Sequence, residues 1–492
     1  MRPICHTHQG QFFIIEKKMN VISGNEFEKP REACGIFGIY NHSEAAKLAY
    51  FGLYALQHRG QESAGIAVFD GTGVQTYKNM GLVSDVFTLN HLESLKGHSA
   101  IGQVRYSTTG GSTLINAQPF MVRHRKRTYA VAHNGNLVNA LEIKNQLEDS
   151  GSILQSTTDS ELFLHLLVKN MKLGLESALI SSVSCLKGAF SFVLLTSKGE
   201  LVGIRDPYGF RPLCLGELQG KPVLASETCA LDLVQADFIR DLEPGEIVII
   251  SDTGIKSIQL PKGNQRAFCI FEFIYFARPD STFDGKNVYQ IRKSHGRCLA
   301  EEAPVDADLV MPFPDSGTYA AIGYSETSGI PFEMGMIRNH YVGRTFIQPT
   351  QSMRDFSVRV KLNPVKEVLK GKDIIIVEDS IIRGTTIKTR VKTLRELGVN
   401  KIHMRVSSPP HRFPCHYGID FSTRGELIAA SKSESELKDF LGLDSLHYIS
   451  IEGLLKSTCT PEPETNFCKA CFDGSYPVSF DKNISKDSLE VQ

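Results

Sequence analysis

The acids Glu378 and Asp379 open the segment of this sequence whose chemistry is easiest to interpret. The apolar run 374–377 predicts a buried strand that leads into both acids and then into a glycine- and threonine-rich turn at 383–386. A glycine at positive φ, followed by a helix N-terminus, presents backbone N–H groups that suit a phosphate. Two acids would repel a phosphate, so they fit better opposite Mg²⁺ or a ribose diol. The order predicts a site for a phosphorylated sugar, although an ordinary strand and polar turn has the same outline.

Two further segments carry groups of the same kind. Asp315 and Ser316 stand where a predicted strand ends and a helix begins, which offers a second place for an anion or Mg²⁺. The segment 343–364 is long, polar and basic, includes Arg344 and Lys361, and is typical of a flexible loop. It suits a lid over pyrophosphate, and a solvated surface loop is the simpler alternative.

Cys34 begins a predicted strand, and by itself it would be interpreted as a core cysteine. The polar, glycine-rich segments 58–67, 102–110 and 132–137 lie between predicted strands, and polar loops of that kind often carry sites. In isolation, Arg105 is compatible with a surface ion pair and Asp159 with a helix N-cap.

Eleven cysteines, an odd number with one close C-x-x-C pair, argue against a disulfide framework and favour a reducing compartment. Cys269, Cys415, Cys468 and Cys471 form a candidate metal site. Four thiolates suit zinc or an iron–sulfur cluster equally. The remaining cysteines are expected in the core (Cys185, Cys214, Cys229 and Cys298) or have no assignment (Cys5 and Cys459).

The length of 492 residues predicts two domains of roughly 200 residues each. The 54 basic and 54 acidic residues give a net charge of +0, which argues against nucleic acid or an anionic membrane as a partner. No apolar run reaches the roughly 18 residues of a membrane span. Residues 1–33 have no sustained periodicity and are interpreted as a leader, with either Met1 or Met19 as the start.

The two halves differ in their predicted secondary structure. From Cys34 to about 261, short strands with few helices predict an α+β layered domain, with helices at 44–57, 160–169 and 175–185. From 308 onward, strands, one of them at 332–337, alternate with helices at 318–328 and 386–397. This order predicts a parallel sheet with ligands at the carboxyl ends of its strands. The polar residues after about 472 are expected to be disordered.

The N-terminal motifs HRGQESAGIA, GQVRYSTTG, NAQPF, AHNGNL, TTDSE and GAFSFV resemble those of the Ntn-type glutamine amidotransferases. Residues 372–386 resemble the phosphoribosyl-pyrophosphate (PRPP) signature of type I phosphoribosyltransferases, with Glu378 where many members have Asp. Both together, over nearly all of 34–474, resemble the glutamine PRPP amidotransferase family in its iron–sulfur branch. The resemblance implies an Ntn glutaminase with an αββα sandwich, followed by an α/β phosphoribosyltransferase domain.

The resemblance also assigns roles in the glutaminase. Removal of the leader makes Cys34 the first residue, and its α-amino group becomes the base that activates the thiol. Asn134 and the N–H of Gly135 would form the oxyanion hole. Arg105 would bind the carboxylate of glutamine and Asp159 its ammonium. His58 is expected to be a supporting residue.

In the second domain the resemblance implies one Mg²⁺ per subunit, held by Ser316, Glu378 and Asp379. It implies one 4Fe-4S cluster per subunit, held by the four candidate cysteines. Eleven residues are expected to contact PRPP: Asp315, Ser316, Arg344, Lys361, Glu378, Asp379, Ser380, Arg383, Gly384, Thr385 and Thr386.

The implied reaction makes 5-phosphoribosylamine, glutamate and pyrophosphate from glutamine, PRPP and water, the first committed step of purine synthesis. The expected domains are a removed leader (1–33), a glutaminase (34–262), a phosphoribosyltransferase (263–455) and a C-terminal segment (456–492). A cytoplasmic homotetramer inhibited by purine nucleotides is expected, with a plastid as the alternative location.

Two alternatives to this activity remain. The glutaminase could feed a sugar phosphate or aspartate, which the PRPP signature argues against. A PRPP-sensing regulator without enzyme activity would need a DNA-binding module, and the sequence has no basic helix for one.

Overall fold

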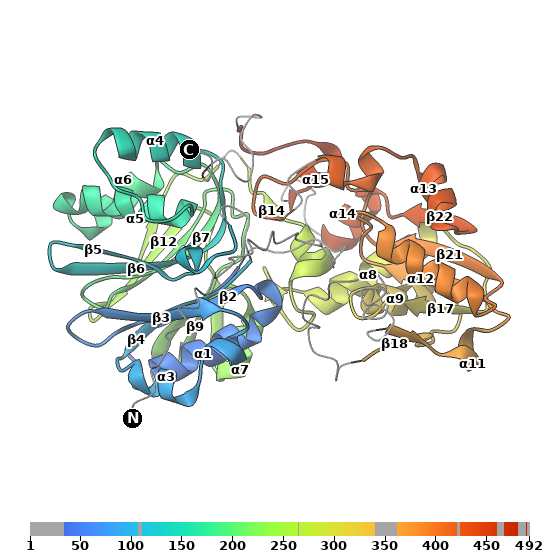
Figure 1. Ribbon diagram of the computed structural model, residues 1–492, viewed down its shortest axis with the longest axis horizontal. Coiled ribbons are helices and arrows are strands. Elements are labelled where there is room, and N and C mark those ends of the chain that lie inside the picture. Colours follow the sequence, from blue (N-terminus) through green and yellow to red (C-terminus); the bar gives the residue numbers. More distant parts are fainter. Residues whose placement is uncertain are drawn as a thin grey trace, which may run out of the picture.

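Two antiparallel sheets and one parallel sheet form the framework of the protein, for which a computed structural model describes residues 34–106, 111–263, 265–339, 362–420, 424–459, 467–480 and 489 (Figure 1). The expected leader 1–33, Arg344, Lys361 and Cys5 lie outside these ranges. Within them, no helix combines the length and the apolar character that crossing a membrane requires.

The first two sheets are made from residues 35–259. In spatial order the seven-stranded sheet consists of β11 (Asp237–Asp241), β9 (Cys214–Leu218), β10 (Lys221–Ala225), β1 (Gly35–Ile39), β4 (Ser99–Arg105), β2 (Ser63–Phe69) and β3 (Val74–Met80). The six-stranded sheet consists of β13 (Gly254–Gln259), β12 (Glu246–Ser251), β8 (Leu201–Arg205), β7 (Gly188–Leu195), β6 (Arg127–Leu137) and β5 (Phe120–His124).

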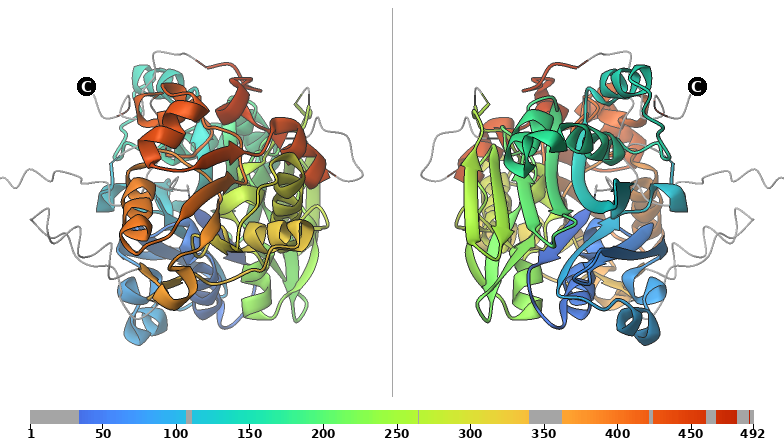
Figure 2. Two further views of the ribbon diagram at one scale, coloured as in Figure 1. Left: turned by 90° about the vertical axis from the view of Figure 1, so that its right-hand side faces the viewer. Right: turned by 90° about the vertical axis from the view of Figure 1, so that its left-hand side faces the viewer.

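Helices cover the outer faces of this pair of sheets (Figure 2, right). The seven-stranded sheet carries α1 (Ala45–Ala55) and α7 (Thr228–Val234), with α2 (Val83–Val86) and α3 (Leu89–Ser94) nearby; the six-stranded sheet carries α4 (Ala140–Asp149), α5 (Asp159–Asn170) and α6 (Leu175–Val183). A separate apolar cluster that includes Ile36, Ala132 and Val193 fills the space between the sheets. The predicted αββα sandwich is therefore confirmed.

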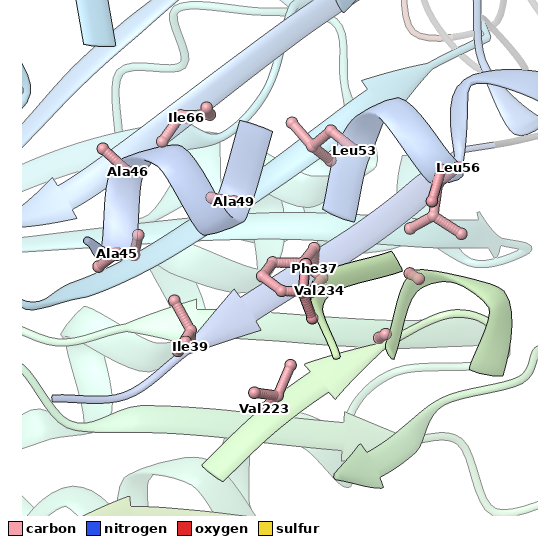
Figure 3. Close-up of a cluster of buried hydrophobic side chains, with 14 of the residues drawn as sticks. Phe37, Ile39, Ala45, Ala46, Ala49, Leu53, Leu56, Ile66, Val223 and Val234 are labelled. Carbon is pink, nitrogen blue, oxygen red and sulfur yellow. The ribbon is translucent and has the colours of Figure 1, made fainter. Parts of the chain in front are cut away.

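Close packing of α1 on the first sheet depends on a glycine. Phe37 of β1 is fully buried beneath α1, among Leu53 and Leu56 (Figure 3). A Cβ on Gly52 would lie 2.3 Å from the Phe37 ring, so only glycine lets the helix approach this closely. The contact fixes the strand that delivers Cys34.

The second half contains a four-stranded parallel sheet in the order β17 (Leu309–Pro312), β20 (Asp373–Glu378), β21 (Lys401–Val406) and β22 (Ser445–Tyr448). Ile375 and Val377 face a cluster shared with α8 (Val288–Glu302) and α9 (Thr318–Ser328). Ile374 and Ile376 face the other cluster, which holds α12 (Thr385–Glu396) and α13 (Glu434–Leu441). Helices on both faces explain why this strand is apolar throughout, and the predicted α/β domain is confirmed.

Short elements join the two halves. β14 (Phe268–Cys269) pairs in parallel with β23 (Phe467–Cys468), and the π-helix η4 (Glu272–Phe276) follows β14. The remaining elements are η1 (Gln57–Arg59), η2 (Leu114–Asn116), η3 (Met171–Leu173), β15 (Thr282–Phe283), β16 (Lys286–Asn287), α11 (Lys366–Leu369), η5 (Arg424–Glu426), η6 (Ile428–Ala430), α14 (Ile451–Cys459) and α15 (Ala470–Asp473). In Figure 1, β14 and α15 lie between the two halves.

Two expectations about local structure need correction. The segment 332–337 was expected as a strand of the parallel sheet, and Phe332 does form a parallel bridge with Val310 of β17. The chain then leaves that sheet, and β18 (Met336–Arg338) pairs antiparallel with β19 (Leu362–Pro364). The segments 102–110 and 132–137 were expected as loops, but their described parts include the ends of β4 and β6. The end of β4 is paired by β1 and β2, whereas residues 132–137 of β6 pair with β7 and extend beyond β5, so polar groups there can serve a site.

The contact between α8 and α9 gives a test of the packing. A Cβ on Gly296 would lie 1.9 Å from the carbonyl oxygen of Ala320. We expect Gly296→Ala to destabilise the protein by about 1–3 kcal/mol because the helices must separate, despite the better helix propensity of alanine. Gly73→Ala is the control, since nothing lies within 4 Å of its Cβ. Urea unfolding midpoints measure both, and equal midpoints would contradict the close approach.

Candidate active sites

Cys34 lies immediately before β1 and is 5% exposed. A pocket at its side chain is lined by Cys34, Arg105, Tyr106, Gln118, His133, Gly135, Thr158 and Asp159. Four of these residues were predicted from the sequence: the nucleophile, both substrate-binding residues and one oxyanion-hole residue. The structure therefore brings together side chains that are as much as 125 positions apart (159 − 34 = 125).

The Cys34 thiol is not ionised by its surroundings. Burial raises its pKa to about 11, although Arg105 opposes the shift. The thiol also donates a hydrogen bond to the Tyr106 carbonyl oxygen, 3.8 Å away. A neutral thiol needs a nearby base to become a nucleophile. The Cys34 backbone is at φ 64, and its carbonyl oxygen accepts a hydrogen bond from Arg59 Nε at 3.3 Å.

Asn134 and Gly135 present donors near the pocket. The Asn134 side chain is fully buried, and neither its Nδ2 nor its Oδ1 has a hydrogen-bond partner among the described residues. A buried amide without partners is costly unless a ligand completes it. Gly135 has φ +145, and a Cβ there would lie 2.0 Å from the Ala189 carbonyl oxygen, so no other residue fits this backbone. The arrangement suits stabilisation of a developing oxyanion.

Asp159 is a buried carboxylate at the first position of α5. Its Oδ2 accepts the Leu137 N–H at 3.0 Å, and its Oδ1 lies 3.2 Å from His133 Nδ1. Burial would raise the pKa of Asp159, but His133 and the hydrogen-bond donors outweigh it and hold the pKa below its usual value. The N-cap of α5 is Thr158, so the alternative interpretation of Asp159 as the cap was wrong.

Arg105 is 3% exposed, so its alternative interpretation as a surface ion pair was wrong. His58 lies outside the pocket, where its Nε2 is 2.7 Å from Glu227 Oε1. Sequence reasoning gave no role to His133 or Gln118. Gln118 accepts the His133 N–H at 2.9 Å and donates to Ser160 Oγ at 2.8 Å. Gln118 lies in the motif NAQPF and His133 in the motif AHNGNL. The available sequence signal for either residue was its position among the other polar residues of these motifs.

The second predicted site lies at the carboxyl ends of β17 and β20. Ser316 Oγ donates to Glu378 Oε1 at 3.3 Å, and Ser380 Oγ donates to Asp379 Oδ2 at 2.6 Å. Both acids are 1% exposed. Ser316 lies beside the two acids because β17 and β20 are neighbouring parallel strands, whose carboxyl ends share one edge of the sheet.

The glycine-rich turn has the predicted geometry. Gly384 is at φ +77 and precedes the first residue of α12, Thr385, whose side chain is exposed. Arg383 is half-buried and Thr386 is partly exposed. Asp315 lies less close to the two buried acids, because its exposed carboxylate forms an ion pair with Arg338 of β18. A turn of this geometry at a helix N-terminus favours binding of an anion.

The four candidate cysteines line one cavity. Cys269 and Cys468 are register partners of β14 and β23, Cys471 is in α15, and Cys415 is in the segment after β21. Burial raises the pKa of Cys269 to about 12, although Arg211, which also lines the cavity, opposes the shift. Cys214 and Cys229 are core residues as predicted and Cys298 is buried, whereas Cys185 is exposed, which corrects its assignment to the core.

In the described ranges, no group of three or more His, Cys, Asp or Glu side chains could hold a metal ion as placed. The thiols instead surround a shared space, whose wall also includes Phe210, Tyr417 and Ile419. Four sulfur ligands around an apolar space fit a multi-atom iron–sulfur group, whose ligands are thiolates. Glu378, Asp379 and Ser316 offer oxygen donors, and Mg²⁺ is commonly bound by one or two carboxylates together with substrate phosphates.

Comparisons with known proteins agree with this architecture. A family model described as a glutamine amidotransferase domain matches residues 109–233. The amidophosphoribosyltransferase of Synechococcus elongatus is 50% identical over 472 residues, covering 94% of this chain and 95% of that protein. The Bacillus subtilis amidophosphoribosyltransferase is 47% identical over 456 residues, covering 92% and 96%.

Two solved structures are similar over almost the whole chain. One is described as the allosteric regulatory enzyme of purine biosynthesis, with a TM-score of 0.89, 46% identity, and coverage of 93% of this chain and 99% of that one. The other is B. subtilis glutamine PRPP amidotransferase complexed with ADP and GMP, with a TM-score of 0.87, 46% identity, and coverage of 93% and 100%.

The fold and its first pocket define a glutamine amidotransferase in which an Ntn-type sandwich is joined to a phosphoribosyltransferase domain. The chain belongs to the amidophosphoribosyltransferase family. The family resemblance found in the sequence is thereby confirmed.

The buried acid Glu227 provides a pH test of the region behind Cys34. Burial alone would raise its pKa, but His58 and Arg59 hold the pKa far below the usual value. The charged form therefore stabilises the fold fully above the unfolded pKa of roughly 4.3, and this stability is lost as the pH falls. We expect Glu227→Gln to cost about 3–5 kcal/mol at pH 7.

The difference in the free energy of unfolding between Glu227→Gln and the parent should narrow by about 1.4 kcal/mol for each pH unit below roughly 4.3. Urea unfolding at pH 7 and at lower pH measures it. Glu176→Gln is the control, because its ion pair with Lys256 is half exposed and should contribute about 0–1 kcal/mol. A Glu227→Gln deficit that stays constant down to about pH 3 would contradict the depressed pKa.

Proposed function

We propose that this protein is a glutamine-dependent amidophosphoribosyltransferase that converts glutamine, PRPP and water into 5-phosphoribosylamine, glutamate and pyrophosphate. The observation that carries the proposal is the pocket shared by Cys34, Arg105, Gly135 and Asp159, in a chain whose relatives of that name match it over almost their full length. The PRPP-type turn at the end of β20 supplies the acceptor site.

The glutaminase half-reaction follows from the pocket. Arg105 binds the α-carboxylate of glutamine and Asp159 its α-ammonium. Cleavage of the bond before Cys34 frees an α-amino group, which takes the thiol proton as sulfur attacks the amide carbon. This base is needed, because burial holds the pKa of Cys34 at about 11.

The negative charge that develops on the amide oxygen is stabilised by Asn134 Nδ2 and the Gly135 N–H. Ammonia leaves with the proton taken from the thiol, and water then hydrolyses the thioester to glutamate. The ammonia crosses an internal channel to C1 of the ribose, where it displaces pyrophosphate.

At the acceptor site, Ser380, Arg383, Gly384, Thr385 and Thr386 bind the 5-phosphate. Arg344 and Lys361 are proposed to contact the pyrophosphate, and Asp315 is proposed as a further contact of PRPP. Mg²⁺ held by Ser316, Glu378 and Asp379 would neutralise diphosphate charge. The hydrogen bond between Ser316 and Glu378 supports that donor set.

The cavity lined by Cys269, Cys415, Cys468 and Cys471 is proposed to hold a 4Fe-4S cluster with a structural role, since neither half-reaction changes a redox state. The proposed domains are 34–262 and 263–455, after a removed leader (1–33) and before a C-terminal segment (456–492). A cytoplasmic homotetramer inhibited by purine nucleotides completes the proposal; the B. subtilis relative solved with ADP and GMP supports nucleotide regulation.

The variant Cys34→Ala tests the two-site mechanism. It should lose glutamine-dependent formation of phosphoribosylamine and keep the activity with free ammonia, because only the glutaminase needs the thiol. Pyrophosphate release with each nitrogen source measures this. Cys214→Ala is the control, since Cys214 is equally buried in the same sandwich but lies outside the pocket. Equal loss of both activities in Cys34→Ala would contradict the mechanism.

The metal content tests the four-cysteine site separately. Protein purified without oxygen should contain about four irons and four acid-labile sulfides per chain. Cys468→Ser should lower both, whereas Cys185→Ser should not, because Cys185 is exposed and lies outside the cavity. Stoichiometric zinc in the parent would overturn the cluster.

A further inference from the structure

Arg211 lies in the wall of the four-cysteine cavity and also takes part in a buried ion-pair chain that ends at Cys34. We propose that Arg211 is a positioning residue that joins the occupied cavity to the glutaminase nucleophile, acting through Glu272 and Arg59. The proposal rests on the proposed role of Cys34. It assigns a role to a residue that the sequence motifs do not single out.

The ion-pair chain runs from Arg211 through Glu272 and Arg59 to Cys34. Arg211 Nη1 donates to Glu272 Oε1 at 3.1 Å. Arg59 approaches the same carboxylate with two nitrogens, Nη2 to Oε1 at 2.8 Å and Nη1 to Oε2 at 3.1 Å. The Nε of Arg59 then donates to the Cys34 carbonyl oxygen at 3.3 Å. All three charged side chains are at most 1% exposed, so water does not screen the chain.

On its other side, the Arg211 guanidinium binds the chain next to Cys415. Its Nε and Nη2 donate to the Tyr417 carbonyl oxygen at 3.3 and 3.2 Å. Tyr417 is two residues after Cys415, and its N–H donates to Cys415 Sγ at 3.4 Å. A shift of Cys415 therefore moves the acceptor that orients Arg211.

The chain that follows Cys415 also contacts β6, the strand of the oxyanion hole, directly. Asn136 Nδ2 donates to the His416 carbonyl oxygen at 3.0 Å. At Gly418, with φ +107, an added Cβ would lie 3.0 Å from Arg211 Nη2 and 3.3 Å from the carbonyl carbon of Gly135. Residues 416–418 thus touch both Arg211 and β6, next to Gly135.

These contacts define what Arg211 does. Its positive charge lies beside four sulfur ligands and one carboxylate, so it balances charge on both sides. Its planar fork reaches Glu272 and the Tyr417 carbonyl at once, which a lysine ammonium on a flexible stem does not reproduce. Correct placement of Arg211 keeps Glu272, Arg59 and the Cys34 carbonyl in place, and this orients the thiol toward its substrate.

The test uses the full-length mature enzyme with its cluster and three variants. Arg211→Lys keeps the charge and removes the fork. Gly418→Ala keeps every ion-pair member and crowds Arg211 and, less closely, the backbone of Gly135. Arg405→Lys is the control for a buried arginine, since Arg405 is 4% exposed and donates to Ala303, Met404 and Ser445 away from the cavity. Gly329→Ala, at φ +73 with nothing within 4 Å of its Cβ, controls for strain at a positive φ.

The first readout is the rate of Cys34 alkylation by a diazoketone analogue of glutamine, and the second is the rate at which the cluster's visible absorbance is lost in air. We expect Arg211→Lys and Gly418→Ala to slow alkylation about tenfold and to speed cluster loss, because a small misplacement of a reacting group is costly. Ammonia-dependent activity should stay within about twofold of the parent, since the acceptor site is untouched. Both control variants should alkylate at the parent rate.

A double-mutant cycle separates transmission from a merely structural effect. Cys468→Ser should itself slow alkylation of Cys34, and combining it with Arg211→Lys should add little further slowing if Arg211 carries the effect. Independent, multiplying effects would overturn the proposal, as would parent-like alkylation in Arg211→Lys. Where Arg211→Lys does not accumulate, Gly418→Ala replaces it in the same cycle. Failure of the reagent to alkylate Cys34 in the parent would instead overturn the proposed function.

Discussion

Two buried carboxylates, Glu227 and Glu272, hold the two halves of this protein in one arrangement. Arg59 pairs with both, and neither acid has any exposed surface. Glu227 also accepts hydrogen bonds from the Arg278 N–H at 2.9 Å and Ser281 Oγ at 2.6 Å. Charges removed from water are tolerated only when their partners are placed accurately. The sandwich and the connecting segment are therefore set by charge matching as well as by apolar packing.

Buried hydrogen bonds and close helix packing continue from these ion pairs toward the acceptor site. Arg292 of α8 is buried and donates to the carbonyl oxygens of Phe273 and Ala277 at 2.9 and 2.8 Å, which satisfies carbonyls at the end of the π-helix. Helix α8 packs on α9 at Gly296, and α9 begins directly after Ser316 and Gly317. A continuous set of packed and hydrogen-bonded elements therefore extends from Cys34 to the carboxyl ends of β17 and β20.

The sequence predicted both domain folds and the residues with unusual chemistry. Helix 318–328 was predicted with its observed ends, and Cys34, Arg105, Gly135 and Asp159 were assigned to one site. The fold and helix predictions succeed because apolar periodicity is encoded over short stretches. The roles of the four site residues stay predictions, although all four line one pocket.

What the sequence did not reveal depends on contacts between distant segments. Arg211 looks like an ordinary arginine until Glu272 and Tyr417 lie beside it. The segment 332–337 makes one parallel bridge, from Phe332 to Val310 of β17, and only the pairing of β18 with β19 shows that the chain then leaves the parallel sheet. Cys185 resembled the other core cysteines, but the end of α6 leaves it exposed.

The parallel pairing of β14 with β23 has a consequence for the order of folding. Cys269 and Cys468 meet only when residues 268 and 467 pair, and the whole parallel sheet is synthesised between them. Closing so long a loop is entropically costly until the intervening domain has formed and brought its ends together. The sandwich and the parallel sheet therefore form before the cavity closes. During synthesis on the ribosome the thiols of Cys269 and Cys468 therefore stay apart until residues 467 and 468 have been made.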